Sequence, residues 1–205
     1  LSAVLLAGLA GGAAGLMAGY HRGAADTVVM RIADFQLALP LILLGIAWAA
    51  FIGTGVAAVV AVVALSSWVQ YARVVRSMAL SLRTSGFVEA CTALGGTGGR
   101  VVVRHLLPIV LPTVAVLATL QLGRAVLLEA TLSFLGLGLQ RPTPAWGLML
   151  SDGRNYLDSA WWVTLFPGAA ISAFVLGANL FGDAIRDVFD PRLATGRRAG
   201  LNQEG

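Results

Sequence analysis

The side chains that could do chemistry are few and of a restricted kind. All fourteen basic residues are arginine, so no lysine is present for a phosphate-binding P-loop or a Schiff base. The single cysteine, Cys91, and two histidines, His21 and His105, are too few for an ordinary zinc site. No serine, histidine and carboxylate stand at spacings typical of a hydrolase. The sequence therefore predicts neither a catalytic site nor a metal centre.

The composition indicates a membrane protein. Hydrophobic residues make up 58% of the 205 residues, charged residues make up 12%, and the mean hydropathy is +0.82. A soluble protein of this size has too much surface to cover with so few charges. The isoelectric point near 10.2 would fit a nucleic-acid-binding protein, but the arginines separate long apolar runs, as membrane topology requires. We expect contact with the lipid bilayer and no nucleic acid.

Uncharged runs predict an all-α, polytopic transmembrane helix bundle with about five spans. Each crossing needs about 20 apolar residues, and the 38-residue run 35–72 fits two spans joined by a turn. We expect a single transmembrane domain over residues 1–192. Its predicted spans cover residues 1–20, 35–52, 56–72, 108–128 and 159–182.

The arginines predict the orientation of these spans. Eleven of the fourteen lie in segments 21–34 and 73–107 and after residue 182, which alternation places on one side. Cytoplasmic loops are enriched in arginine, so we expect this side, including a tail at 193–205, to be cytoplasmic and loop 129–158 to be external. The first span has no basic start and no initiator Met, so we expect a missing upstream segment rather than a signal peptide.

One segment of the predicted cytoplasmic loop has the pattern of a short amphipathic helix. Ser85 or Gly86 can begin this helix and Gly95 can end it. Its small apolar face has helical spacing and consists of Phe87, Ala90, Cys91 and Leu94. Such a helix has no core of its own, so it lies either flat in the lipid interface or in a groove of another protein. The narrow face of small residues beside Glu89 favours the groove.

A basic helical stretch follows this short helix and leads into the membrane. Arg100 and Arg104 are four residues apart, and we expect them to hold Glu89 electrostatically. Leu107 and Pro108 then begin the next predicted span.

These residues resemble a known family. Glu89-Ala90, Gly95 and Leu107-Pro108 have the spacing of the EAA loop of ABC-importer permeases, with Cys91 in place of the second alanine. The outer segments 129–138 and 142–147 are similar to those of the peptide branch. Together they resemble the C-type permease of dipeptide, oligopeptide and nickel ABC importers, whose type I fold has six spans where this chain supplies five.

The resemblance implies a transport subunit without its own ATPase site. Its EAA helix would be a coupling helix on separate ABC ATPase subunits, which would hold ATP and Mg²⁺, so no cofactor is expected in this chain. The other implied partners are a second permease, forming a heterodimer, and an extracytoplasmic substrate-binding protein. The implied location is the bacterial or archaeal cell (inner) membrane, with the C-terminus in the cytoplasm. The implied coupling residues are Phe87, Glu89, Ala90, Cys91, Leu94, Gly95, Arg100, Arg104, Leu107 and Pro108.

Two further groups of residues carry open alternatives. Arg124 is a charge inside a predicted span, about four residues from its outer end, so it either snorkels to the interface or lines the translocation path, with Glu129 nearby. The apolar outer loop either contacts a binding protein or forms a lid on its own spans. The expected contact residues are Phe134, Pro142, Pro144 and Trp146.

An ion-coupled secondary transporter is the competing function. Such proteins place acidic residues, histidines or broken helices near the middle of the membrane. None of the predicted spans has an acidic residue at its middle, which favours the importer permease.

Overall fold

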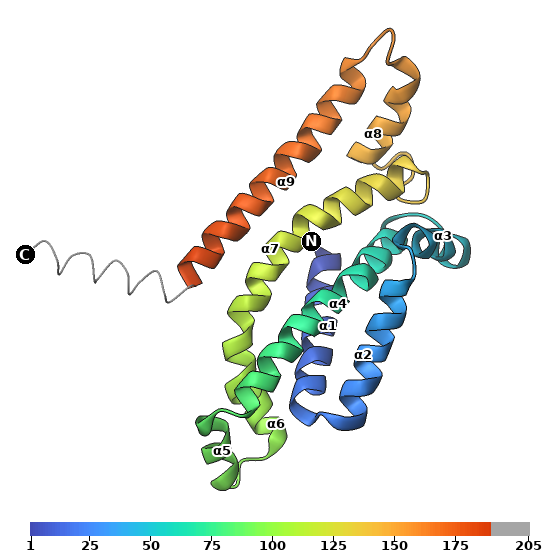
Figure 1. Ribbon diagram of the computed structural model, residues 1–205. Coiled ribbons are helices and arrows are strands. Elements are labelled where there is room, and N and C mark those ends of the chain that lie inside the picture. Colours follow the sequence, from blue (N-terminus) through green and yellow to red (C-terminus); the bar gives the residue numbers. More distant parts are fainter. Residues whose placement is uncertain (190–205) are drawn as a thin grey trace, which may run out of the picture.

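The computed structural model describes residues 1–189, and within this range every regular element is helical (Figure 1). A π-helical turn, Val102–Leu106, joins α6 to α7, and a 3-10 turn, Arg154–Tyr156, follows α8. The predicted all-α bundle is confirmed, while the predicted tail at 193–205 lies outside the described residues. The helices are α1 (Ser2–His21), α2 (Gly23–Ala38), α3 (Leu41–Ile52), α4 (Val56–Arg83), α5 (Gly86–Ala93), α6 (Gly98–Val101), α7 (Leu107–Phe134), α8 (Trp146–Gly153) and α9 (Trp162–Phe189).

Four helical runs in residues 1–189 are long and apolar enough to cross a membrane. They are α1, α4, the continuous run from α6 through α7, and α9. Helices α2 and α3 would supply a fifth crossing only as a pair bent by 97°. The bend follows from Pro40, because Leu39 before it is extended and a proline disfavours helical geometry in the preceding residue.

Segment 21–34, which the sequence predicts to be a cytoplasmic loop, forms most of α2 instead. Its acidic residues pair with arginines of α4: Asp26 with Arg76, and Asp34 with Arg73 at 2.7 Å. The two acidic residues of this segment are therefore neutralised by residues of a second helix. The predicted start of a span at residue 35 falls inside this helix.

The predicted spans 56–72 and 108–128 lie inside longer helices. Helix α4 continues to Arg83, and the next run already begins at Gly98, so the loop predicted at 73–107 shrinks to residues 84–97 around α5. Helix α7 continues to Phe134, past the predicted end at residue 128. A helix does not end where its first charge appears, because the backbone hydrogen bonds continue beyond the apolar stretch.

Helices α1 and α4 pack closely through glycines of α1. A Cβ on Gly19 would lie 2.7 Å from both the Cβ of Ala79 and the carbonyl oxygen of Arg76. Gly15 and Gly11, one and two turns earlier on α1, meet the α4 backbone in the same way. Small residues let two backbones approach, which is the usual basis of helix pairing in membranes.

At one end of the bundle a single apolar cluster joins α1, α4, α5 and the α6–α7 run. The buried members come from all four elements and include Leu16 of α1 and Val88 of α5. The remaining buried members are Val75, Ala79, Val101, Leu106 and Val110. We call these seven residues the shared core. Figure 1 shows this α5 end opposite the end that carries α3 and α8.

At the opposite end α8 packs between α7 and α9 (Figure 1). A Cβ on Gly147 of α8 would lie 2.8 Å from the Cα of Ala130 in α7, and one on Gly153 would lie 2.6 Å from Thr164 Oγ1 near the start of α9. The segment predicted as an external loop at 129–158 thus contains the end of α7 and a helix. Its packing agrees with a lid on the chain's own spans.

Candidate functional site

Helix α5 is a short helix held between two long ones. It begins after Ser85, whose carbonyl oxygen accepts hydrogen bonds from the backbone of Val88 and Glu89. It ends at Ala93, and two residues later Gly95 has a φ of +84°, a conformation that favours glycine. The sequence placed this helix correctly, because a start signal, an apolar spacing and a glycine stop all coincide there.

The predicted apolar face of α5 is largely exposed. Leu94 is 89% exposed and Phe87 is 40% exposed, and Ala90 is exposed beside them. A helix that shows its apolar side chains while its other side is buried is suited to bind a partner. We call Phe87, Ala90 and Leu94 the α5 face.

Cys91, the fourth residue predicted for this face, turns inward instead. It is half-buried against the shared core, and its Sγ lies 3.9 Å from His105 Nε2. Val88, which the sequence analysis did not single out, is 3% exposed and anchors the helix. The exposed face is therefore rotated from the predicted one. Val88 and Cys91 are three residues apart, so they lie on the same side of this two-turn helix and form its buried side.

Glu89 makes none of the ion pairs expected from the sequence. Within residues 1–189 it has no salt bridge with Arg100 or Arg104, both of which are exposed on the helical run that follows. Glu89 instead borders a polar hollow of about 490 Å³ together with Arg22 and Arg83. The expected ion pairs of Glu89 do not form because the turn at residues 94–97 separates α5 from the helical run that carries Arg100 and Arg104.

The end of the predicted motif lies where α6 continues into α7. Leu107 is half-buried against the shared core, and Pro108 is exposed in the first turn of α7. Proline is tolerated there because the first turn of a helix leaves its backbone N–H groups unpaired. The π-helical turn before Leu107 keeps the run continuous.

Arg124 lies further from the end of its helix than the sequence indicated. Helix α7 continues ten residues beyond it, and its Nη1 donates a 2.8 Å hydrogen bond to Oε1 of Gln70 in α4. The same Gln70 oxygen accepts a hydrogen bond from Gln121, one turn before Arg124. The side chain thus reaches across to α4.

Glu129 lies in a different place from Arg124. Its Oε1 accepts a 2.6 Å hydrogen bond from Ser133, and it borders a hollow of about 300 Å³ with Pro144 and Trp146. The structure therefore places Glu129, which was predicted for the translocation path, in the same hollow as Pro144 and Trp146, which were predicted for the binding-protein contact. The first turns of α8 and the end of α7 supply this hollow.

The remaining two residues of the predicted external contact lie elsewhere. Phe134, 39% exposed, borders a separate hollow of about 290 Å³ between α7, α8 and α9. Pro142 is exposed in the connection before α8. This connection is tied to α8 by an ion pair between Arg141 and Asp152, and that pairing raises the pKa of Arg141.

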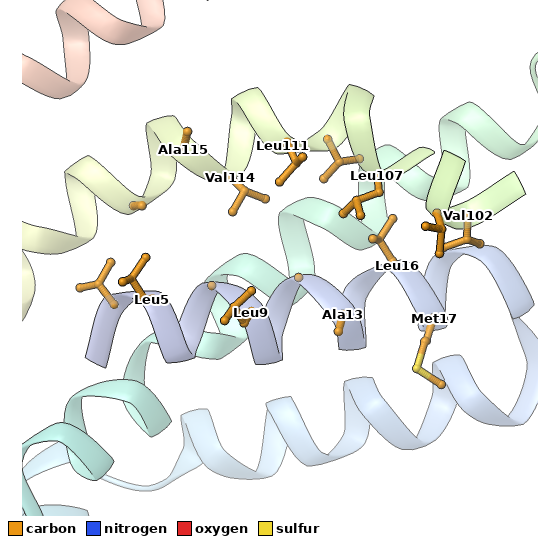
Figure 2. Close-up of a pocket in the computed structure, with 16 residues that line it drawn as sticks. Leu5, Leu9, Ala13, Leu16, Met17, Val102, Leu107, Leu111, Val114 and Ala115 are labelled. Carbon is orange, nitrogen blue, oxygen red and sulfur yellow. The ribbon is translucent and has the colours of Figure 1, made fainter. Parts of the chain in front are cut away.

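A wholly apolar groove of about 560 Å³ runs between α1 and the α6–α7 run (Figure 2). Leu5, Leu9 and Ala13 of α1 face Leu111 and Val114 of α7 across it. Its lining offers no charged or hydrogen-bonding side chain, so it is a packing surface for lipid or another apolar helix and carries no chemistry.

These features define a class of protein before any comparison is made. The described part is a polytopic helical membrane protein with a short, anchored helix offered to a partner at one end. It also carries a polar cluster between two of its long helices. Within residues 1–189 no three His, Cys, Asp or Glu side chains lie close enough to hold a metal ion.

Residues 11–195 match the family model of the binding-protein-dependent transport system inner membrane component, and the chain belongs to this family of transport permeases. It is 44% identical over 87% of its length to the dipeptide transport system permease protein DppC of Alkalihalophilus pseudofirmus. It is 40% identical over 94% to the probable D,D-dipeptide transport system permease protein DdpC of Escherichia coli. It is 42% identical over 94% to the nickel transport system permease protein NikC of the same species.

The chain spans 59%, 64% and 68% of the length of these three relatives, respectively. The family resemblance drawn from the EAA spacing and the outer segments is confirmed. The family also agrees with a multi-pass inner-membrane protein, as the four or five candidate spans require.

Proposed function

We propose that this chain forms half of the translocation path of a binding-protein-dependent ABC importer for peptides or related small ligands such as nickel. Separate ATPase subunits would supply the energy, a second and different permease would complete the path, and an external binding protein would deliver the ligand. The C-terminus would be cytoplasmic. The family of the chain and the printed functions of its relatives support this proposal.

The single observation that carries the proposal is the construction of α5. Its face of Phe87, Ala90 and Leu94 is open to a partner, while Val88 is fixed in the shared core. A push on α5 would therefore move α1, α4 and α7 together, because close-packed interiors transmit displacement. This is the mechanical property that a coupling helix needs.

The other residues of the loop would support this helix. Gly95 would set the turn after α5, and Cys91 would pack its inner side against His105. Glu89 would meet the partner at the rim of the polar hollow, with Arg100 and Arg104 exposed for acidic or polar groups of the same partner. Leu107 and Pro108 would pass the movement into α7.

On the outer side, we assign the hollow of Glu129, Pro144 and Trp146 to contact with the binding protein and to entry of the ligand. Phe134 and Pro142 would extend this contact on either side of α8. Arg124 would line the path further in. The end of α7 and the start of α8, which line this hollow, lie at the opposite end of the bundle from α5 (Figure 1), so delivery and energy input would occur at opposite ends.

The test replaces Leu94 with aspartate and follows uptake and ATP hydrolysis by the complete transporter. Leu94→Asp puts a charge on the exposed face without touching the shared core, so the protein should insert and remain folded. Binding-protein-stimulated uptake should fall at least about tenfold, the effect of losing about 1.4 kcal/mol at an interface. Leu157→Asp, the same change at a half-exposed residue of the opposite end, is the matched control.

Two results would count against the proposal. Leu94→Asp with normal uptake would show that the α5 face binds nothing that matters for transport. Uptake that persists in ATP-depleted cells with an intact proton gradient would favour an ion-coupled transporter instead.

A further inference from the structure

The polar cluster between α4 and α7 holds a positive charge without a negative partner. Gln70 Oε1 accepts hydrogen bonds from Gln121 Nε2 and from Arg124 Nη1, the latter at 2.8 Å. Gln121 is 3% exposed, so its amide is fixed and in turn fixes the oxygen of Gln70. The guanidinium of Arg124 is thereby held by a neutral group.

Two other arginines of this protein are each neutralised by a carboxylate. Arg73 and Arg76 of α4 pair with Asp34 and Asp26 of α2. Arg124 has no carboxylate within 4.0 Å anywhere in residues 1–189. Its net charge therefore remains available to a ligand.

The position of this charge, far from the ends of a long apolar helix, points to a function. Gln70 lies 14 residues from Val56 and 13 residues from Arg83, the two ends of α4. With a rise of 1.5 Å per residue, the cluster is about 20 Å from either end of that helix. A cation in the middle of a membrane is costly, and such residues mark the routes of substrates or ions.

The free part of Arg124 has a definite chemistry. A guanidinium has five N–H donors in a planar fork, and Gln70 uses the hydrogen bond of one terminal nitrogen. The side chain is exposed, so the other donors are open. That fork matches the two oxygens of a carboxylate, which it binds through parallel hydrogen bonds.

We propose that Gln70 is a positioning residue that presents Arg124 to a carboxylate of the transported molecule, at a point far from either end of α4. This inference rests on the proposed function and narrows its substrate class. The cargo bears a carboxylate, as a peptide does at its C-terminus, and is not a bare divalent cation, which the uncompensated charge of Arg124 repels. Gln121 secures the geometry by holding the acceptor oxygen of Gln70.

The amide of Gln70 is the feature that distinguishes this role from a structural one. A glutamate there would hold Arg124 more firmly but would cancel its charge. If the cluster only joins α4 to α7, Gln70→Glu should preserve transport. If Arg124 receives the cargo, the same variant should stop it.

The experiment uses the complete transporter in proteoliposomes, with its binding protein, and radiolabelled dialanine as the probe. Gln70→Glu and Arg124→Gln should each reduce uptake by about tenfold or more, since each removes a charge-assisted hydrogen bond to the cargo. The double variant should be worse than Arg124→Gln alone, because it leaves the new carboxylate without its arginine partner and facing a carboxylate cargo. Thr119→Val, a change of similar size on α7 outside the cluster, should transport near the wild-type rate.

Wild-type uptake by either single variant would overturn the inference. Should Gln70→Glu fail to insert, Arg124→Gln alone decides, because it keeps an amide donor for Gln70 and loses only the charge. Unchanged uptake together with loss of co-purifying phospholipid would show that Arg124 holds a lipid phosphate instead, and would also overturn it.

The same assay separates this inference from the proposed function. If uptake by the wild type needs ATP and is lost in Leu94→Asp, the importer proposal stands whatever the Gln70 variants do. If the complete transporter shows no ATP-dependent uptake of any ligand that its binding protein holds, the proposed function itself fails.

Discussion

The two ends of the bundle are built differently. At the α5 end, residues from α1, α4, α5 and the α6–α7 run bury one another in the shared core. At the opposite end, α9 packs chiefly on α7 and α8, and it leaves large apolar side chains exposed. Exposed side chains of α9 include Phe166, Leu176, Leu180, Phe181 and Val188. The shared core ties four elements together at one end, whereas α9 leaves apolar side chains exposed along its length.

The largest effect is expected from a charge placed inside the shared core. Val88→Asp would bury an unpaired carboxylate at a position that is 3% exposed, at a cost of about 4 kcal/mol or more. The detergent-purified protein should unfold at a clearly lower temperature, and uptake should be lost with it. Leu94→Asp, six residues away but exposed, should lower uptake and leave the unfolding temperature unchanged. If Val88→Asp and Leu94→Asp lowered the unfolding temperature equally, Val88 could not be an anchor in the core while Leu94 lies on an exposed docking face.

A smaller effect is expected at the opposite end. Gly147→Val would push side-chain atoms into the backbone of Ala130, which the Cα–Cβ distance of 2.8 Å does not allow, at a cost of about 1–3 kcal/mol. The protein should lose part of its thermal stability while α5 still couples to ATP hydrolysis. Phe181→Ala, which shortens an exposed side chain of α9, is the control and should change stability by about 0.5 kcal/mol or less. Loss of ATPase stimulation in Gly147→Val would show that the two ends are not independent.

The sequence predicted the helical class, the position of α5 and the family, because each depends on local patterns. The length of an apolar run indicates a membrane span, and the spacing from Glu89 to Pro108 indicates the EAA loop of the family. The boundaries of α2 could not be predicted in the same way. Segment 21–34 was expected to be a loop, and the partners of Asp26 and Asp34 that hold it against α4 lie 50 and 39 residues away in the sequence.

The same limit explains Arg124 and Cys91. The depth of Arg124 depends on its contact with Gln70, which is 54 residues away in the sequence and has no local signal. Cys91 points inward because of the rotation of α5 about its axis where it packs on the shared core. A two-turn helix has too few residues for its periodicity to predict that rotation. Sequence patterns within one helix therefore predicted its structure, whereas contacts between helices could not be predicted from such patterns.

The most direct test of the account asks what touches the α5 face in a native membrane. Cys91 is the only cysteine in the sequence, so a Cys91→Ala background allows a single new cysteine at Leu94→Cys to carry a photo-crosslinker. The account predicts an adduct with an ATPase subunit whose yield changes when ATP is added. An adduct with phospholipid alone, with or without ATP, would contradict it.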